Sequence, residues 1–152
     1  PEGGTDEFGY YWPHARGHIG TYSRTNHTMP RDFARHLAWQ WSHPDGKYST
    51  VIVGGPVIDH KKNLYITCET GVHKFSPDGK ELWYWRPISG FIHTSPSLHD
   101  GAVYGNVGNG YMFALDMETG REVWAEKKAK ESPGDTGYVE AHDGLVLAGM
   151  DS

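Results

Sequence analysis

The chain has 152 residues, enough for one domain with its own hydrophobic core. Aromatic residues make up 13% of the sequence, and 20 glycines and 9 prolines accompany them, a balance that favours short strands and turns over a helix bundle. The formal net charge of −5 excludes a general binder of phosphate backbones, because such binding requires clustered Lys and Arg, so we expect no nucleic-acid partner. Apolar runs are too short to predict a membrane span.

The first part of the chain, residues 1–36, is predicted to be an irregular segment that leads into the first sheet. His14 and His18 lie four residues apart, which on a helix would place both imidazoles on one face as metal ligands. Pro13 and Gly17 argue against a helix here, so this spacing does not indicate a metal site.

A repeat with a period near 40 residues extends from about residue 41 to the end of the sequence. Trp41, Trp83 and Trp124 lie 42 and 41 residues apart, and Gly79 precedes Gly120 by 41 residues. Such self-similarity indicates stacked structural units. The predicted units are a first strand within 37–53, two complete units at 54–93 and 94–135, and an incomplete unit at 136–152.

Each unit has the pattern of antiparallel strands joined by turns. In the run YMFALD, Phe113 and Leu115 alternate with Met112 and Ala114, so the two pairs face opposite sides of a strand. No helical pattern separates one unit from the next. Strand groups that recur every 40 or so residues suggest radially stacked sheets.

A tight turn precedes the last strand of each unit. Asp78 and Asp116 are predicted turn residues, and Gly79 and Gly120 are expected to adopt a positive φ. The tryptophan that ends the next strand can then lie flat across a neighbouring sheet, where its burial contributes on the order of several kcal/mol. The residues predicted to pack the sheets together are Trp41, Phe75, Trp83, Ala114, Leu115 and Trp124.

The segment ALDMETGREVW, residues 114–124, resembles the repeat of the pyrroloquinoline-quinone-type (PQQ-like) β-propellers in its Ala-Leu-Asp, Thr-Gly and Trp spacing. KFSPDGKELW at 74–83 resembles a variant of that repeat with an Asp-Gly turn, and the stretch from Trp12 to Trp41 resembles the segment that leads into such propellers. The resemblance implies an all-β fold, with consecutive four-stranded antiparallel sheets of an incomplete propeller of about two and a half blades.

Catalytic members of this family hold the quinone between a tryptophan and a disulfide of adjacent cysteines, and hold calcium with carboxylate and amide groups. Cys68 is the one cysteine of this sequence, so the resemblance transfers no quinone site, and no local motif supplies calcium ligands. We therefore predict no catalytic, cofactor-binding or metal-binding residue. PQQ and calcium would be cofactors only if the chain belonged to a quinone-dependent dehydrogenase.

The remaining candidate groups are interpreted as structural. His60, His99 and His142 fall in corresponding turns, and Cys68 is predicted to be a small buried strand residue. The glycine-rich run at 105–110 leads into a strand, whereas a phosphate-binding loop opens a helix. Trp39, Tyr84 and Trp85 are less determined by the pattern and are the candidates for a partner surface.

Propellers close with about four to eight sheets, so two complete units do not close a ring. An open arc would expose strand edges and a half-buried face. We therefore expect further blades of the same chain, or other protein chains of a larger complex, to cover the open side. This favours a non-catalytic scaffold or accessory subunit that stabilises a larger assembly through its edges and loops.

Two alternatives remain open. One is a fragment of a quinone-dependent alcohol or sugar dehydrogenase whose active site lies in other blades. The other is a sugar- or peptide-binding propeller that uses Tyr84 and Trp85 for stacking. Because family members often work outside the cytoplasm, the resemblance also suggests an extracytoplasmic space or organelle lumen, with peripheral association with a membrane complex.

Overall fold

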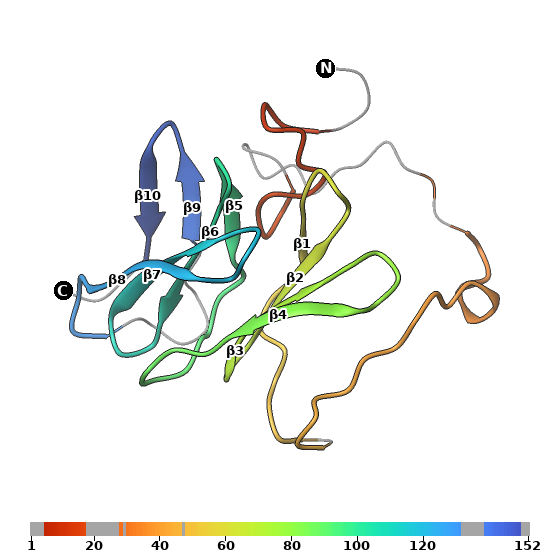
Figure 1. Ribbon diagram of the computed structural model, residues 1–152, viewed down its shortest axis with the longest axis horizontal. Coiled ribbons are helices and arrows are strands. Elements are labelled where there is room, and N and C mark those ends of the chain that lie inside the picture. Colours follow the sequence, from red (N-terminus) through yellow and green to blue (C-terminus); the bar gives the residue numbers. More distant parts are fainter. Residues whose placement is uncertain (1–4, 18–27, 29, 47, 132–138, 150–152) are drawn as a thin grey trace.

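The computed structural model describes residues 5–17, 28, 30–46, 48–131 and 139–149. These residues form ten strands and one short 3-10 turn at Phe33–Arg35, and they contain no α-helix. Two four-stranded antiparallel sheets and a two-stranded hairpin follow one another along the chain (Figure 1). The predicted all-β class, with consecutive four-stranded sheets, is therefore confirmed. Within the described part of the chain, no helix has the length and hydrophobicity needed to cross a membrane.

The two sheets have the same internal order, since each strand pairs with the next one along the chain. The first sheet consists of β1 (Val57–Ile58), β2 (Leu64–Cys68), β3 (Gly71–Phe75) and β4 (Glu81–Trp85). The second consists of β5 (Ser97–His99), β6 (Ala102–Val107), β7 (Tyr111–Asp116) and β8 (Glu122–Lys127). The hairpin is formed by β9 (Val139–His142) and β10 (Leu145–Ala148).

The strand register also repeats from one sheet to the next. Lys74 is paired with Trp83 in the first sheet, and Ala114 is paired with Trp124 in the second, each pair being followed at once by a bulge. The hairpin corresponds to the first two strands of a third sheet, because the motif HDG joins β9 to β10 as it joins β5 to β6. The repeat seen in the sequence is therefore a repeat of backbone pairing.

In the second sheet, Asp116 fixes the turn before the last strand. Its carboxylate accepts hydrogen bonds from the hydroxyl of Thr119 (2.6 Å) and from its backbone N–H (2.7 Å), and these bonds hold the pKa of Asp116 below its ordinary value. Gly120 has a φ of +71°, which favours glycine, and it donates its N–H to the carbonyl of Asp116 at 2.8 Å.

In the first sheet, Ser76 has the corresponding role. Its hydroxyl accepts a hydrogen bond from the N–H of Lys80 at 3.1 Å and donates one to the carboxylate of Asp78. Gly79 has a φ of +84°, close to that of its counterpart in the second sheet. Two different polar side chains thus produce the same glycine turn at the same place in the repeat.

The main core lies between the facing sides of the two sheets. Tyr65 and Val72 from the first sheet are fully buried together with Val103, Phe113 and Leu115 from the second. Each such side chain contributes about 1.5–3 kcal/mol by leaving water. The packing of one sheet on the other therefore stabilises the described part of the chain by burying apolar side chains from both sheets.

The N-terminal segment 5–17 lies across the first strands of both sheets. Trp12 and Ile58 exchange two backbone hydrogen bonds, of 3.0 and 2.8 Å, at the free edge of β1. The carbonyl of Pro13 then accepts a hydrogen bond from the N–H of Leu98 in β5, at 2.8 Å. The segment contains no named strand, but it satisfies edge groups of both sheets and so links them.

The strand predicted within residues 37–53 is not formed. The described residues in this range contain no strand, and a single bridge pairs Ile52 with Cys68 of β2. The end of the range does lie beside β2, because the N–H of Val53 donates to the carbonyl of Thr67 at 2.9 Å and the carbonyl of Val51 accepts the N–H of Glu69 at 3.0 Å. The described residues before Val51 have no such ladder with a described strand. The range instead contacts, through Trp39 and Trp41, the side of the first sheet that faces away from the second.

Candidate functional site

The first and second sheets meet where the indole of Trp83 covers the turn at Gly120, a contact that we call the Trp83 seam. The indole N–H donates to the carbonyl of Met117 at 3.2 Å. A Cβ added to Gly120 would lie 2.6 Å from the Trp83 ring, so glycine is the residue that leaves room for the indole. The tryptophan and the glycine that the repeat singled out are therefore in direct contact.

A second seam of the same kind lies on the opposite side of the first sheet, between Trp39 and Gly79; we call it the Trp39 seam. The indole N–H of Trp39 donates to the carbonyl of Pro77 at 3.0 Å, and its ring lies 5.6 Å from that of Phe75. A Cβ on Gly79 would lie 2.5 Å from the Trp39 ring. The flat contact of an indole on a glycine turn therefore occurs twice.

The structure places Trp39, and not Trp41, at the position equivalent to Trp83. The sequence shows two tryptophans separated by one residue in each case, 39 and 41 or 83 and 85, and both members of a pair lie on the same side of an extended chain. Trp39 precedes its glycine turn by 40 residues, whereas Trp83 precedes its turn by 37. Residue spacing alone therefore selects Trp41, which is two residues nearer to Gly79, instead of Trp39.

The second tryptophan of each pair packs beside the first. Trp41 lies 4.9 Å from the ring of His73 and 5.4 Å from that of Phe75. Trp85 lies 4.5 Å from the ring of Phe113, which occupies the position of His73 in the next sheet. Trp39 and Trp85, the candidates for a partner surface, thus contact neighbouring sheets.

Tyr84 remains closer to the surface, with 41% of its area exposed. Its ring stacks on His73 at 4.4 Å and its hydroxyl donates to the carbonyl of Thr70 at 3.0 Å. The hydroxyl group and one face of the Tyr84 ring therefore both make contacts within the first sheet.

Trp124 occupies the same register as Trp83, on the side of the second sheet that faces the hairpin. Its ring is half-buried and lies 6.2 Å from that of Tyr104. No described glycine turn lies against the Trp124 ring. β10 pairs with β9 alone among the described strands, so its other edge has no described partner. We call the region from the Trp124 ring to this edge of β10 the Trp124 face.

A buried cation supports the Trp83 seam. Lys74 is 2% exposed, and its ammonium group donates to the carbonyl of Met117 at 2.8 Å and lies 3.8 Å from the carboxylate of Glu118. Burial lowers the pKa of Lys74, and the nearby carboxylate opposes that shift. The Lys74 side chain therefore bonds the first sheet to the turn of the second.

A buried histidine lies under the Trp39 seam. His73 is 2% exposed, and its Nδ1 lies 2.9 Å from the carboxylate of Glu81. Its Nε2 is buried and has no hydrogen-bond partner among the described residues. Burial lowers the pKa of His73, and the hydrogen bond to Glu81 acts in the opposite direction.

Ser97, His14 and Glu140 meet where the N-terminal segment, the second sheet and the hairpin join. Nδ1 of His14 lies 2.8 Å from the hydroxyl of Ser97 and 2.8 Å from the carboxylate of Glu140, and the same hydroxyl accepts the N–H of Ala141 at 3.1 Å. A hydrolytic triad needs serine and carboxylate on opposite nitrogens of the ring. Here both contact one nitrogen, so the geometry is that of a structural junction.

Cys68 is fully buried, and burial raises the pKa of its thiol to about 11. The thiol therefore stays protonated near neutral pH and is a poor nucleophile. A lone buried thiol also does not fit a quinone held by adjacent cysteines.

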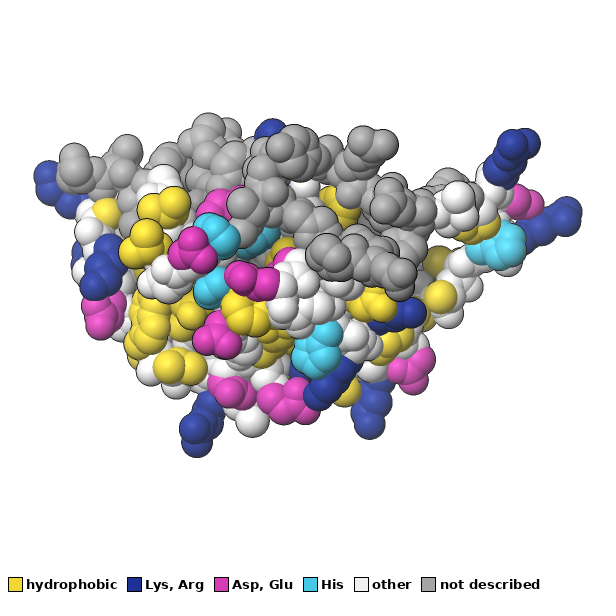
Figure 2. Space-filling model, turned by 90° about the horizontal axis from the view of Figure 1, so that it is seen from above, with side chains coloured by type: hydrophobic (Ala, Val, Ile, Leu, Met, Phe, Trp, Pro, Cys, Tyr) yellow, Lys and Arg dark blue, Asp and Glu magenta, His cyan; other side chains and the backbone are white. Residues whose placement is uncertain are grey.

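One group of side chains in the described residues has the spacing of metal ligands. Ligand atoms of Glu7, His142 and Asp143 all lie within 4.8 Å of one another. In the face seen in Figure 2, several acidic and histidine side chains lie near one another, and most Lys and Arg side chains lie at the edges. Sequence patterns did not predict this group, because Glu7 is far along the chain from His142 and Asp143. All three are exposed, and an imidazole does not suit calcium, which prefers oxygen ligands.

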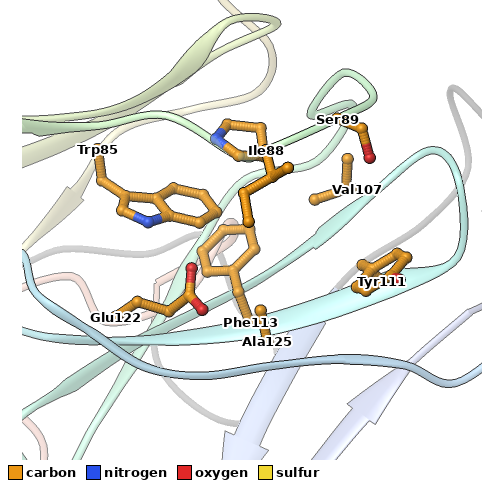
Figure 3. A pocket seen from close by; sticks show the side chains of 9 residues that line it. Trp85, Ile88, Ser89, Val107, Tyr111, Phe113, Glu122 and Ala125 are labelled. Carbon is orange, nitrogen blue, oxygen red and sulfur yellow. The ribbon is translucent and has the colours of Figure 1, made fainter.

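A cavity of about 150 Å³ opens between the outer strands of the two sheets. Figure 3 shows the rings of Trp85 and Tyr111 on its two sides, Phe113 and Ala125 at its floor and Ile88 above. Glu122 supplies the one charged group of the lining. None of these residues was predicted as a pocket, because the lining is brought together from four separate segments.

Comparison with known proteins supports the fold alone. No protein-family model matches the chain, and no curated protein matches it. Among solved structures, a europium-containing methanol dehydrogenase superposes with a TM-score of 0.74 and 17% sequence identity, over 95% of this chain. The chain spans 28% of the length of that protein. We conclude that the described residues have the fold of part of a PQQ-like β-propeller.

Proposed function

We propose that this chain is a structural part of a PQQ-like β-propeller and that its Trp124 face receives a further sheet of the same kind. The observation that carries the proposal is the repeated seam, in which Trp39 covers Gly79 and Trp83 covers Gly120. Trp124 has the register of Trp83 and no glycine turn beneath it in the described residues. We therefore infer that Trp124 also covers a glycine turn, one that belongs to the next sheet.

The repeated seam also defines the chemistry of what the Trp124 face receives. It must offer a glycine with positive φ, so that the indole can lie flat, and a turn carbonyl that accepts the indole N–H, as the carbonyls of Pro77 and Met117 do. It must also offer a strand that pairs with β10. A β-hairpin with a polar-Gly turn meets all these needs, whether it comes from the same chain or from another.

The experiment supplies that hairpin from the chain's own sequence. Residue 148 corresponds to residue 105, because HDG at 142–144 repeats HDG at 99–101. A copy of residues 106–135 fused after residue 148 would therefore complete the third sheet in phase. We expect the fusion to unfold at a higher urea concentration than the original chain, because the third seam buries further apolar surface.

The matched control carries Gly120→Val in the added copy alone, where a side chain would occupy the space needed by the Trp124 ring. We expect this control to lose most of the gain. Equal midpoints for the fusion, its control and the original chain would contradict the proposal.

A second candidate function is that of a dehydrogenase, with this chain as part of the complete propeller. It is one of the two alternatives that the sequence left open. What favours it is the structural similarity to a methanol dehydrogenase. The sequence has no adjacent cysteines, and the described residues contain no cluster of carboxylates that suits calcium, so a quinone site of the family's kind would need ligands from outside the described residues. The test is alcohol-dependent reduction of a dye by a protein that contains the complete propeller, with and without added PQQ and metal. Reduction would support the dehydrogenase, and no reduction under any of these conditions would contradict it.

Binding of sugars or peptides by Tyr84 and Trp85 has no comparable support. Tyr84 and Trp85 are adjacent on β4 and point to opposite sides of the sheet, Tyr84 towards His73 and Trp85 towards Phe113, so they do not form one stacking platform. We therefore do not propose that role.

A further inference from the structure

We propose that the cavity between the outer strands of the two sheets binds a small organic cation of the alkylammonium class. The cavity lies on the side of the second sheet opposite to the Trp124 face, so this inference is independent of the proposed scaffold role. Its volume of about 150 Å³ fits a group of a few heavy atoms, since a cavity of roughly this size holds one benzene molecule in other proteins.

The walls of the cavity are of the kind that attracts cations. Three aromatic side chains, Trp85, Tyr111 and Phe113, line it, and aromatic faces attract a positive charge through their quadrupoles. The rings of Trp85 and Phe113 lie 4.5 Å apart, so they form one continuous surface across the seam. Tyr111 stands on the other side of the opening in Figure 3.

The charge of the lining selects a cation over a neutral ligand. The carboxylate of Glu122 is the one charged group of the lining, and in Figure 3 it points towards Trp85 and Phe113. No lysine, arginine or histidine of the described residues forms an ion pair with it. By contrast, Glu126 of the same strand is paired with Lys128. Glu122 is therefore available to a ligand.

The wall above the floor is fixed before any ligand arrives. The side-chain amide of Asn109 donates to the hydroxyl of Ser89 at 2.9 Å and to its carbonyl at 3.3 Å. Gly90 has a φ of +84° and fits closely against Val107 and Asn109. The same loop carries Ile88, whose side chain is fully exposed and lies above the cavity in Figure 3. A preformed wall lowers the entropic cost of binding.

The test compares choline with 3,3-dimethyl-1-butanol, which has the same shape without the charge, by NMR titration of the full 152-residue chain. We expect choline to shift the Trp85 indole signal and the amides of Tyr111, Phe113 and Glu122 saturably, and the neutral alcohol to bind at least several-fold more weakly. Glu122→Gln should weaken choline binding roughly fivefold, the upper range for one exposed ion pair.

Glu126→Gln is the matched control, because it removes a carboxylate from the same strand on the opposite side of the sheet, and it should leave choline binding unchanged. Equal binding of the two ligands would show an apolar site and overturn the proposal. The absence of a saturable shift, or an unchanged affinity in Glu122→Gln, would overturn it as well.

Discussion

The Trp83 seam and the Trp124 face begin from the same local structure and differ in what lies beyond it. In both, a tryptophan follows a polar-Gly turn and is paired with the residue that precedes a bulge. Trp83 lies on Gly120 and donates to Met117, whereas Trp124 has Tyr104 beside it and no described glycine turn below it. The comparison teaches that each sheet carries a donor side, the tryptophan, and an acceptor side, the glycine turn.

The largest expected effect comes from removing the two tryptophans in turn. Trp83→Ala should lower the free energy of unfolding by about 2–4 kcal/mol, because it removes a half-buried indole and leaves a cavity on the turn. Trp124→Ala should cost less than about 1 kcal/mol, because its ring lacks that turn. Urea unfolding of both variants measures the difference, and equal losses would show that the two tryptophans have equivalent surroundings.

A smaller effect is expected from the acceptor side of the seam. Gly120→Ala should cost about 1–3 kcal/mol more than Gly101→Ala. The two glycines have φ values of +71° and +74°, so the backbone strain is shared, but a Cβ meets the Trp83 ring at the first position and nothing within 4 Å at the second. If both variants lost the same stability, the ring contact would have no part in the requirement for glycine.

Ser97→Ala should lower the stability of the hairpin formed by β9 and β10 by about 1–2 kcal/mol. Ser97→Ala leaves the buried N–H of Ala141 without its acceptor, so β9 and β10 should open more often. Hydrogen exchange is the measurement, with faster exchange expected at 139–148 and unchanged exchange in β6 and β7. Uniform acceleration across both sheets would contradict a local junction.

The smallest effect concerns pH, and it compares His73 with Phe113, which occupies the same position in the next sheet. Because burial holds the pKa of His73 below its ordinary value of 6.5, the unfolded chain binds a proton that the folded chain does not as the pH falls through 6.5 towards that lowered pKa. This histidine therefore contributes a loss of stability in that window, and the loss is absent at higher pH.

His73→Phe gives the first sheet the ring of the second and should remove this contribution. Urea midpoints at pH 7.5 and pH 5.5 check it: the difference between the two midpoints should be smaller in the variant than in the original chain. An equal difference in both would mean that other groups cause the pH dependence.

The sequence was sufficient to predict the sheets but not the partners of particular side chains. Strand alternation and glycine turns are local sequence signals. The alternation around Phe113 and the turn at Gly120 were therefore enough to predict strands joined by turns. The choice between Trp39 and Trp41 depends on how a loop places two tryptophans against another sheet, and no local pattern encodes that. The cavity around Glu122 was missed for the same reason, since its walls come from segments that meet only after the sheets pack.

The most direct test of the account is the hydrogen exchange of the tryptophan indole N–H groups, measured by NMR in the original chain and in the fusion that carries the added copy of residues 106–135. The account predicts that Trp83 is protected in both proteins, and that Trp124 exchanges fast in the original chain and becomes protected in the fusion. Protection of Trp124 in the original chain equal to that of Trp83, or fast exchange of Trp124 in both proteins, would contradict it.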